Sequence, residues 1–396
     1  MWDHWSWVSG LIIVIWVIAE IAHHYYYIYQ VRKIDQIYAK ASLDRDVDVV
    51  DLPFAQDYEF YWSRVSEDHK ATVFKWAAEA GMDFDKVIKD AINSHISNDY
   101  IQGVDPGNCL PLSFLFRSYN TLKLFLTGLK LRRLGFKSLF LKCVDLHYYS
   151  APDERNQKPL LIIYPQFSGE FSVLAIFTQL RHKCDILFVA PRCVQLTWNF
   201  TPCRHSDALE EYLPIVLKYK SVYPLCWSAG NLSFQVLDRY LQQRGMRDKI
   251  NAVVRLDPLG YPTSNFLVYS GATIPWSKLY SKFLQIGSHF NPAISLRNHF
   301  GCLGLSYLLK SSHGYTYVKL GRMLRVTKLV PAPYPEILIT ASFDPTWAHN
   351  HPFFQNDRTV LFANVSEEKV EGFHGLWINH QTLKVRVLPI LMKLLD

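Results

Sequence analysis

The sequence predicts an α/β fold built on a mostly parallel β-sheet with helices on both faces. From about residue 138 to the C-terminus, short apolar runs typical of buried strands alternate with segments of helical periodicity. Apolar residues make up 49% of the 396-residue chain and charged residues 19%, which supplies a large core and argues against disorder. Because sheets of this kind can occupy roughly 250 residues as one unit, we expect one large domain with appendages.

The expected elements follow one another in a regular order. The strands are rich in apolar residues and are expected at 138–149 (one long strand or a strand pair), 160–164, 186–189, 222–227, 252–256, 336–340 and 360–363. The helices of this part are expected at 171–181, 207–219, 231–244 and 382–395. Upstream, 31–137 is expected to be a helical region of its own.

The N-terminal segment predicts a membrane anchor at residues 1–30. Trp5 to Ile21 is an almost unbroken apolar run, flanked on both sides by aromatic residues. A cleaved signal peptide is the alternative, and it fits less well because the n-region holds Asp3 and no Lys or Arg. Basic residues follow the run at Arg32, Lys33 and Lys40, so the positive-inside rule predicts a single-pass membrane protein with its main body on the cytoplasmic side.

The charge distribution points to an anionic membrane surface as a partner. Net charge is +7, and the stretches 107–144 and 261–333 carry Lys and Arg without any Asp or Glu. No nucleic-acid-binding signature accompanies these basic stretches, so nucleic acid is not expected as a partner. Leu112 to Arg133 is apolar with periodic basic residues, which fits either an interfacial amphipathic helix or a core-packing helix with a basic rim.

The seven cysteines are scattered and show neither a zinc spacing nor a disulfide framework. Reduced thiols in a cytosol-facing domain are therefore expected. His349, His351 and His380 lack the carboxylate partners and spacing of a metal site. No phosphate-binding glycine loop or dinucleotide fingerprint is present. The sequence thus predicts a protein that uses no metal and no cofactor.

The stretch 222–237, VYPLCWSAGNLSFQVL, carries the most chemical information. An apolar strand runs into Cys226, Trp227, Ser228, Ala229 and Gly230, and a helix follows. This resembles the nucleophile elbow of the α/β-hydrolases, in which a serine sits on a strained strand-to-helix turn. Gly230 matches the second glycine of that motif, whereas Cys226 replaces the first. The competing interpretation is a serine that caps an ordinary helix.

The resemblance implies a Ser-His-Asp triad. Asp344 follows the strand predicted at 336–340, and His374 lies in a predicted loop before the final helix. The order Ser228, Asp344, His374 is the chain order of the α/β-hydrolase triad. In such a triad His374 accepts the proton of Ser228, and Asp344 orients the imidazole. Asp257 is the alternative acid, because some relatives carry it after the sixth strand.

The same resemblance implies an oxyanion hole and a cap. One donor is expected to be the amide of Ala229, and the other the amide of Gln166 or Phe167, after the strand at 160–164. This loop reads Pro-Gln where relatives usually have His-Gly, which puts catalysis in question. The long connection at about 261–333, basic and aromatic, is expected to form a helical cap over the serine.

The functional prediction is a membrane-anchored serine hydrolase that cleaves a carboxylic ester of a lipid or another hydrophobic acyl compound, within an α/β-hydrolase domain at 138–396. An acyltransferase that uses the same triad is one alternative, because an alcohol can intercept the acyl-enzyme in place of water. A catalytically inactive lipid-binding or scaffold protein with this fold is the other, suggested by Cys226 and by the Pro-Gln loop.

Overall fold

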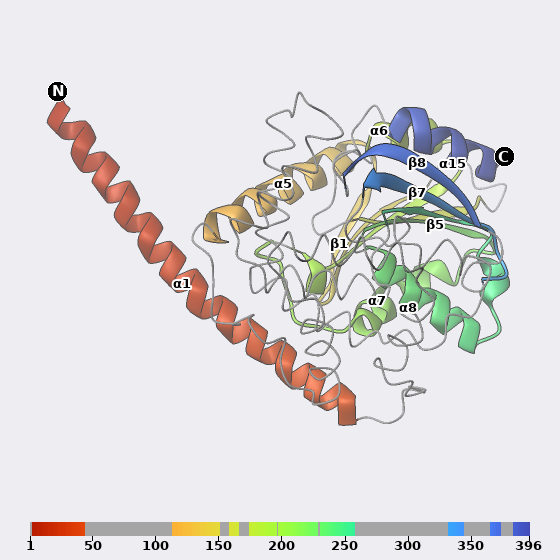
Figure 1. Cartoon of the computed structure of the whole chain (residues 1–396), viewed down its shortest axis with the longest axis horizontal. Helices are drawn as coiled ribbons and strands as arrows, with labels where there is room; N and C mark the ends of the chain where they lie inside the picture. Colours follow the sequence, from red (N-terminus) through yellow and green to blue (C-terminus); the bar gives the residue numbers. More distant parts are fainter. Residues whose placement is uncertain are drawn as a thin grey trace, which may run out of the picture.

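The computed structural model describes residues 2–43, 113–150, 158–165, 174–195, 197–228, 230–257, 332–343, 365–373 and 383–396. Most of the helical region expected at 31–137, and residues 261–331 of the cap expected at about 261–333, lie outside these residues. The described part contains a single sheet, the helices on its two faces, and a long N-terminal helix that extends away from them (Figure 1).

The sheet has eight strands in the order β1-β2-β4-β3-β5-β6-β7-β8. The two N-terminal strands are antiparallel to each other and β2 is antiparallel to β4, whereas every other pair is parallel. This is the strand order of the α/β-hydrolase fold, as the sequence predicted. The strands are β1 (Lys137–Phe140), β2 (Val144–Tyr149), β3 (Leu160–Tyr164), β4 (Asp185–Pro191), β5 (Val222–Trp227), β6 (Val253–Leu256), β7 (Glu336–Phe343) and β8 (Val365–Phe373).

Apolar sequence explains why the central strands were found correctly. Every residue of β3 and β4 is buried, as expected for strands covered on both faces. The segment 138–149 is a strand pair, and its two strands form a hairpin in which Phe140 pairs with Asp145.

The C-terminal strands differ from the prediction. The last strand is β8 at Val365–Phe373, whereas the predicted range 360–363 lies outside the described residues. The reason is its composition: VSEEKVEGF is charged and lacks the apolar run used to find the other strands. Strand β8 extends to Phe373, the residue directly before His374, and β7 runs three residues beyond the predicted end at Thr340.

Helices cover both faces of the sheet (Figure 1). On one face lie α6 (Leu174–Leu180), the π-helical turn Leu383–Val387 and α15 (Leu388–Leu395). On the other lie α7 (His205–Val216) and α8 (Gly230–Gln243), which contact each other and the central strands. Of the helix expected at 171–181, the described residues show Leu174–Leu180 as helical. The bounds of the three other expected helices agree with the structure to within a few residues.

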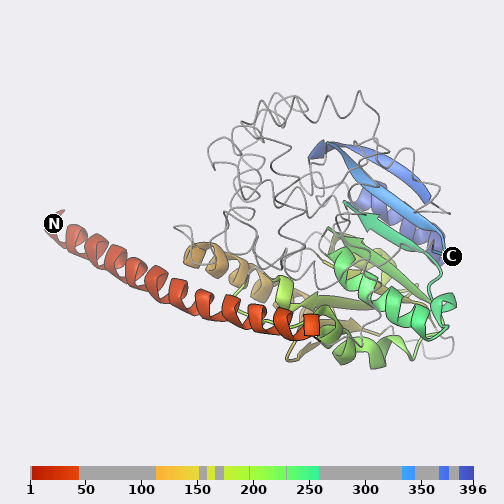
Figure 2. The ribbon, with the colours of Figure 1, turned by 60° about the horizontal axis from the view of Figure 1, so that its bottom comes forward.

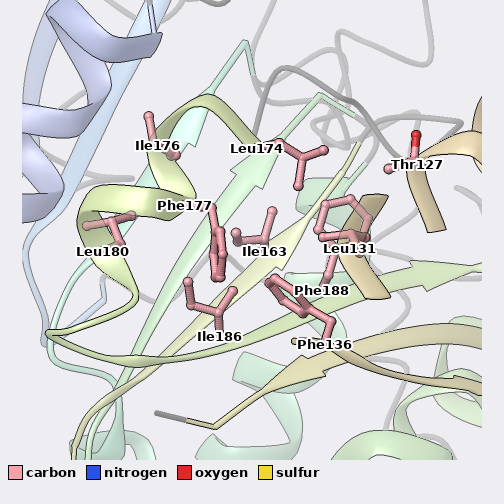
Figure 3. A pocket seen from close by; sticks show the side chains of 10 residues that line it. All are labelled: Thr127, Leu131, Phe136, Ile163, Leu174, Ile176, Phe177, Leu180, Ile186 and Phe188. Atoms are coloured by element: carbon pink, nitrogen blue, oxygen red, sulfur yellow. The ribbon is translucent and has the colours of Figure 1, made fainter. Parts of the chain in front are cut away.

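An apolar hollow lies on the α6 face (Figure 3). It is lined by side chains of α5, α6 and the sheet, among them Leu131, Phe177 and Phe188, and by Phe136 in the turn between α5 and β1. Thr127 is the one polar residue that lines the hollow, and its hydroxyl donates a hydrogen bond to the carbonyl of Lys123 in the same helix, at 2.8 Å. Its volume of about 10 Å³ is close to the least that holds one water molecule, so the hollow is a packing gap and offers no room for a substrate.

Two further helices lie at the edge of the domain. Helix α1 (Trp2–Leu43) is much longer than the predicted apolar run, and its segment Trp7–Gln30 is long and apolar enough to cross a membrane. Helix α5 (Ser113–Arg133) lies between α1 and the sheet (Figure 1, Figure 2). The two helices contact each other where the Glu20 carboxylate accepts a hydrogen bond from the amide of Phe114, at 3.1 Å.

Candidate active site

Ser228 directly follows β5, and one residue separates it from the start of α8. Its φ of 47° lies in the left-handed region, which non-glycine residues seldom adopt. Its amide donates to the carbonyl of Leu256 at 2.9 Å, and its carbonyl accepts from the amide of Asn231 at 3.0 Å. An N-cap serine has an extended backbone, so the conformation of Ser228 is not that of a serine that only caps a helix. The strained strand-to-helix turn that the sequence predicted is present.

Gly230 explains why this turn needs a small residue. A Cβ atom added at Gly230 would lie 2.2 Å from the carbonyl oxygen of Tyr164, at the end of β3. No side chain fits there, because the obstructing atom belongs to the backbone of a central strand. The glycine thus lets the start of α8 approach β3 closely. Ala229, the expected oxyanion donor between Ser228 and Gly230, lies outside the described residues.

Cys226 occupies the position where the elbow motif has its first glycine. It is fully buried, and it pairs with Tyr164 on one side and Arg255 on the other. Burial raises the pKa of its thiol far above the ordinary value. The thiol is therefore protonated and shielded from solvent at neutral pH, so Cys226 is a packing residue and not a rival nucleophile.

Asp257 is the described residue most like Ser228. It follows β6 directly, is fully buried, and has a φ of 40°. In the described part of the chain, Ser228 and Asp257 are the two non-glycine residues with positive φ. They lie at the same level of neighbouring strands, because Trp227 pairs with Leu256 in the parallel register. Strained backbone of this kind gathers at functional sites.

The two other residues of the predicted triad follow strand ends that pair with each other. Strand β7 ends at Phe343 and β8 ends at Phe373, and these two residues are register partners. Asp344 and His374 are the next residues in the chain, and both lie outside the described residues. The structure therefore brings together the strand ends that precede the predicted acid and the predicted base.

The expected oxyanion loop begins where β3 ends. Tyr164 is the last residue of β3 and Pro165 follows it. Gln166 and Phe167 lie outside the described residues. Because β3 pairs with β5 in parallel and Tyr164 pairs with Cys226, this loop leaves the sheet beside the elbow.

A buried ion pair supports the elbow and was not found from the sequence. The guanidinium of Arg255 donates to the Glu336 carboxylate at 2.6 Å and to the Asn231 side-chain oxygen, and it stacks over the ring of Phe234 at 4.9 Å. The side chains of Arg255 and Glu336 are 6% and 5% exposed. The group thus links β6, β7 and the first turn of α8. Arg255 lies within the apolar-looking run 252–256, and no sequence signal paired it with a residue 81 positions away.

Further polar groups lie between the sheet and helices α7 and α8. The hydroxyls of Tyr164 and Tyr212 are 3.1 Å apart and both side chains are buried, which raises both pKa values above the ordinary range. His205 is also buried; its Nδ1 lies 3.1 Å from the Ser233 hydroxyl, and burial lowers its pKa to about 4. Its imidazole is therefore neutral at physiological pH.

Among the described residues, no group of three or more His, Cys, Asp or Glu side chains could hold a metal ion. The five described cysteines are all free and buried. His349, His351 and His380, which the sequence weighed as metal ligands, lie outside the described residues.

Three solved structures with a similar fold are distant from this chain in sequence. A type II thioesterase from the borrelidin biosynthetic cluster is 14% identical, with a TM-score of 0.43 over 66% of this chain and 100% of that one. An α/β-hydrolase fold protein from Chitinophaga pinensis is 11% identical, with a TM-score of 0.42 over 65% and 96%. The epoxide hydrolase of Bacillus megaterium is 12% identical, with a TM-score of 0.39 over 65% and 99%. No family model and no curated protein matches the sequence.

Proposed function

We propose that the protein is a membrane-anchored serine hydrolase that cleaves a carboxylic ester through an acyl-enzyme on Ser228. The observation that carries this proposal is the elbow: a buried serine with a φ of 47° between β5 and α8, held by a glycine that touches the backbone of β3. Natural sequences retain strain of this kind where the turn presents a reactive group.

The reaction assigned to the triad has two halves. The Ser228 hydroxyl attacks the acyl carbon while the His374 imidazole takes its proton, and the resulting oxyanion is stabilised by backbone amides. The imidazolium then gives that proton to the departing alcohol, which leaves Ser228 acylated. In the second half, water attacks the acyl carbon, His374 takes a proton from the water, and the carboxylic acid departs as Ser228 recovers its proton.

Asp344 is the proposed acid of the triad, and the register makes Asp257 its rival. In favour of Asp344, it and His374 come directly after Phe343 and Phe373, the paired residues at which β7 and β8 end. In favour of Asp257, it lies at the level of Ser228 on the next strand, whereas Asp344 comes four positions after Thr340, the residue of β7 at that level. Loss of the true acid should reduce kcat by about ten-thousand-fold, so Asp344→Asn and Asp257→Asn distinguish the two.

The proposed substrate is a lipid or another hydrophobic acyl ester. Two features of the chain support a lipid substrate because they favour a location at a membrane. An apolar helix able to cross a membrane precedes the domain, and two long stretches carry basic residues without acids. An alcohol acceptor in place of water would make the same site an acyltransferase. An inactive lipid-binding protein remains the rival from another class, because the loop after β3 begins with Pro165 and Gln166 in place of His-Gly.

Labelling with a fluorophosphonate probe tests the proposal on the full chain in detergent or native membranes. The wild type should be labelled, and Ser228→Ala should not. The control is Ser233→Ala, which removes a hydroxyl from the next turn of α8 and should leave labelling intact. An unlabelled wild type that still retains lipid would favour the binding protein, and labelling that survives Ser228→Ala would refute the catalytic role of Ser228. Product analysis with and without an added alcohol separates hydrolysis from acyl transfer.

A further inference from the structure

Helix α5 has its apolar side turned away from the domain. Six large apolar side chains of α5 are between 37% and 64% exposed: Leu115, Tyr119, Leu122, Phe125, Leu126 and Leu129. Five of them, at 115, 119, 122, 126 and 129, repeat every three or four residues and so form one stripe along the helix. We call these six side chains the outer stripe. A surface helix normally buries such a stripe against its own domain.

The side of α5 that packs on the domain is the more polar one. Its buried residues include Arg117, Asn120 and Thr127 beside Leu124 and Leu131. Arg117 donates to the carbonyl of Thr197 at 3.0 Å, and its guanidinium lies 5.4 Å from the centre of the Phe200 ring. These contacts fix the rotation of the helix, so the outer stripe cannot turn inward without breaking them. Exposed apolar surface of this extent marks a surface that is covered by something else.

We propose that the outer stripe of α5 lies in the surface of the same lipid bilayer that α1 enters, which gives the domain a second membrane contact beside its anchor. The first argument is continuity with α1. Glu20 of α1 accepts a hydrogen bond from the amide of Phe114, and His23 lies edge-on to the rings of Phe114 and Trp198, at centroid distances of 6.3 and 5.0 Å. The start of α5 is thus attached to α1 at Glu20 and His23.

The length of α1 places this attachment near the membrane surface. Within the apolar segment Trp7–Gln30, Glu20 and His23 contact the domain, so the part of α1 left to cross the bilayer is the stretch from Trp2 to Ala19. At about 1.5 Å per residue this stretch measures about 27 Å, which nearly spans a hydrocarbon core of about 30 Å. The next residue is Glu20, which accepts the hydrogen bond from Phe114 of α5. From there, α5 leads away from α1 along the edge of the domain, and the N-terminal half of α1 projects beyond the domain (Figure 1). This is the arrangement of a helix lying in the membrane surface beside a helix that crosses it.

Charge and neighbouring residues match a bilayer with anionic lipids. Helix α5 ends with the exposed cations Lys130, Arg132 and Arg133, and its first turn has no acid. The adjoining edge strand β1 adds the exposed side chains of Leu139 and Phe140, 46% and 53% exposed, and the Arg132 guanidinium lies 5.7 Å from the centre of the Phe140 ring. Apolar side chains rimmed by cations suit acyl chains beneath negatively charged headgroups.

The test uses the full chain reconstituted in phosphatidylcholine vesicles with about 30% phosphatidylserine. Leu122→Cys, and Gln242→Cys at the exposed end of α8 as the matched control, each carry an environment-sensitive fluorophore. The unsubstituted chain, treated in the same way, gives the background from its own cysteines. Quenching is measured with a nitroxide-bearing lipid and, separately, with aqueous iodide. We expect the probe at Leu122 to be quenched by the lipid and protected about five-fold from iodide, relative to the probe at Gln242.

Each other outcome counts against the proposal. Equal access of iodide to both probes would show that the outer stripe faces water, and protection from both quenchers would show that protein covers it, as in contact with a second copy. Adding Phe125→Asp and Leu126→Asp to the Leu122 variant should restore iodide access. The inference rests on α1 as the anchor in the proposed function, so flotation of the vesicles at alkaline pH reports α1 separately, and activity at Ser228 does not enter.

Discussion

The two faces of the sheet are built from different kinds of interaction. Under α6 and α15 the core is a continuous apolar cluster that includes Leu161, Ile163, Phe177, Leu180 and Leu383. Under α7 and α8, buried polar groups are interleaved with the apolar ones and meet in specific pairs. Apolar contacts are non-directional and tolerate repacking, whereas a buried hydrogen-bonded pair orients both side chains. Removing one partner of such a pair costs stability, because the other is left buried without a hydrogen bond. The elbow lies where that directional face meets the carboxyl ends of the strands.

The largest expected effect comes from the closest backbone approach on the polar face. Gly230→Ala should destabilise the full chain by more than about 4 kcal/mol, or prevent folding, because the new Cβ would overlap the Tyr164 carbonyl. Gly128→Ala on α5 is the matched control: its Cβ would lie 3.6 Å from the His147 ring, an ordinary contact, and alanine favours a helix. Denaturant unfolding in micelles measures both. Equal stability of the two variants would show that Gly230 does not lie as close to the Tyr164 carbonyl as described.

Next in size is the buried ion pair. Arg255→Met should cost about 3–5 kcal/mol, because it leaves the Glu336 carboxylate buried without its cation. Adding Glu336→Leu should recover most of that loss. On the apolar face, Leu180→Ala should cost about 2–5 kcal/mol by opening a cavity, and Glu336→Leu should not relieve it. A double-mutant cycle in which Arg255 and Glu336 behave additively would remove the contrast between the faces.

His205 should make stability depend on pH. Its folded pKa is about 4, below about 6.5 in an unfolded chain, so the unfolded state binds the proton first as pH falls. The stabilisation is complete above about pH 6.5 and is lost as pH falls toward 4, by about 3 kcal/mol. His205→Gln should lack this part of the dependence. Because burial also lowers the pKa of His147 to about 4, the difference between wild type and variant isolates His205. Parallel pH profiles would contradict the prediction.

The smallest effect belongs to the tyrosine pair. Tyr212→Phe keeps the ring and removes one of two hydroxyls that lie 3.1 Å apart, so it should cost about 1 kcal/mol. Tyr164→Phe should cost a similar amount, and the double variant should cost less than the sum, because neither hydroxyl is then left alone. Thermal unfolding of the three variants provides the measurement. Full additivity would mean that the two hydroxyls do not depend on each other.

The sequence by itself determined the fold and the position of Ser228. Buried strands such as 160–164 and 222–227 are unbroken apolar runs, and the small residues around Ser228 mark a tight strand-to-helix turn; both are local signals. It misplaced β8 because VSEEKVEGF is charged, and its choice of acid and base, Asp344 and His374, stays a prediction.

Only the tertiary structure decided what pairs across long sequence separations. The register sets Asp257 level with Ser228, joins Arg255 to Glu336, and makes Phe343 and Phe373 partners. The tertiary structure also places the apolar stripe of α5 on the outside of the domain, although the sequence of that helix fits a core-packing helix equally well. These outcomes depend on which strands become neighbours and on which side of a helix packs against the sheet. No stretch of sequence encodes such contacts locally, because each one forms between segments that meet only in the folded chain.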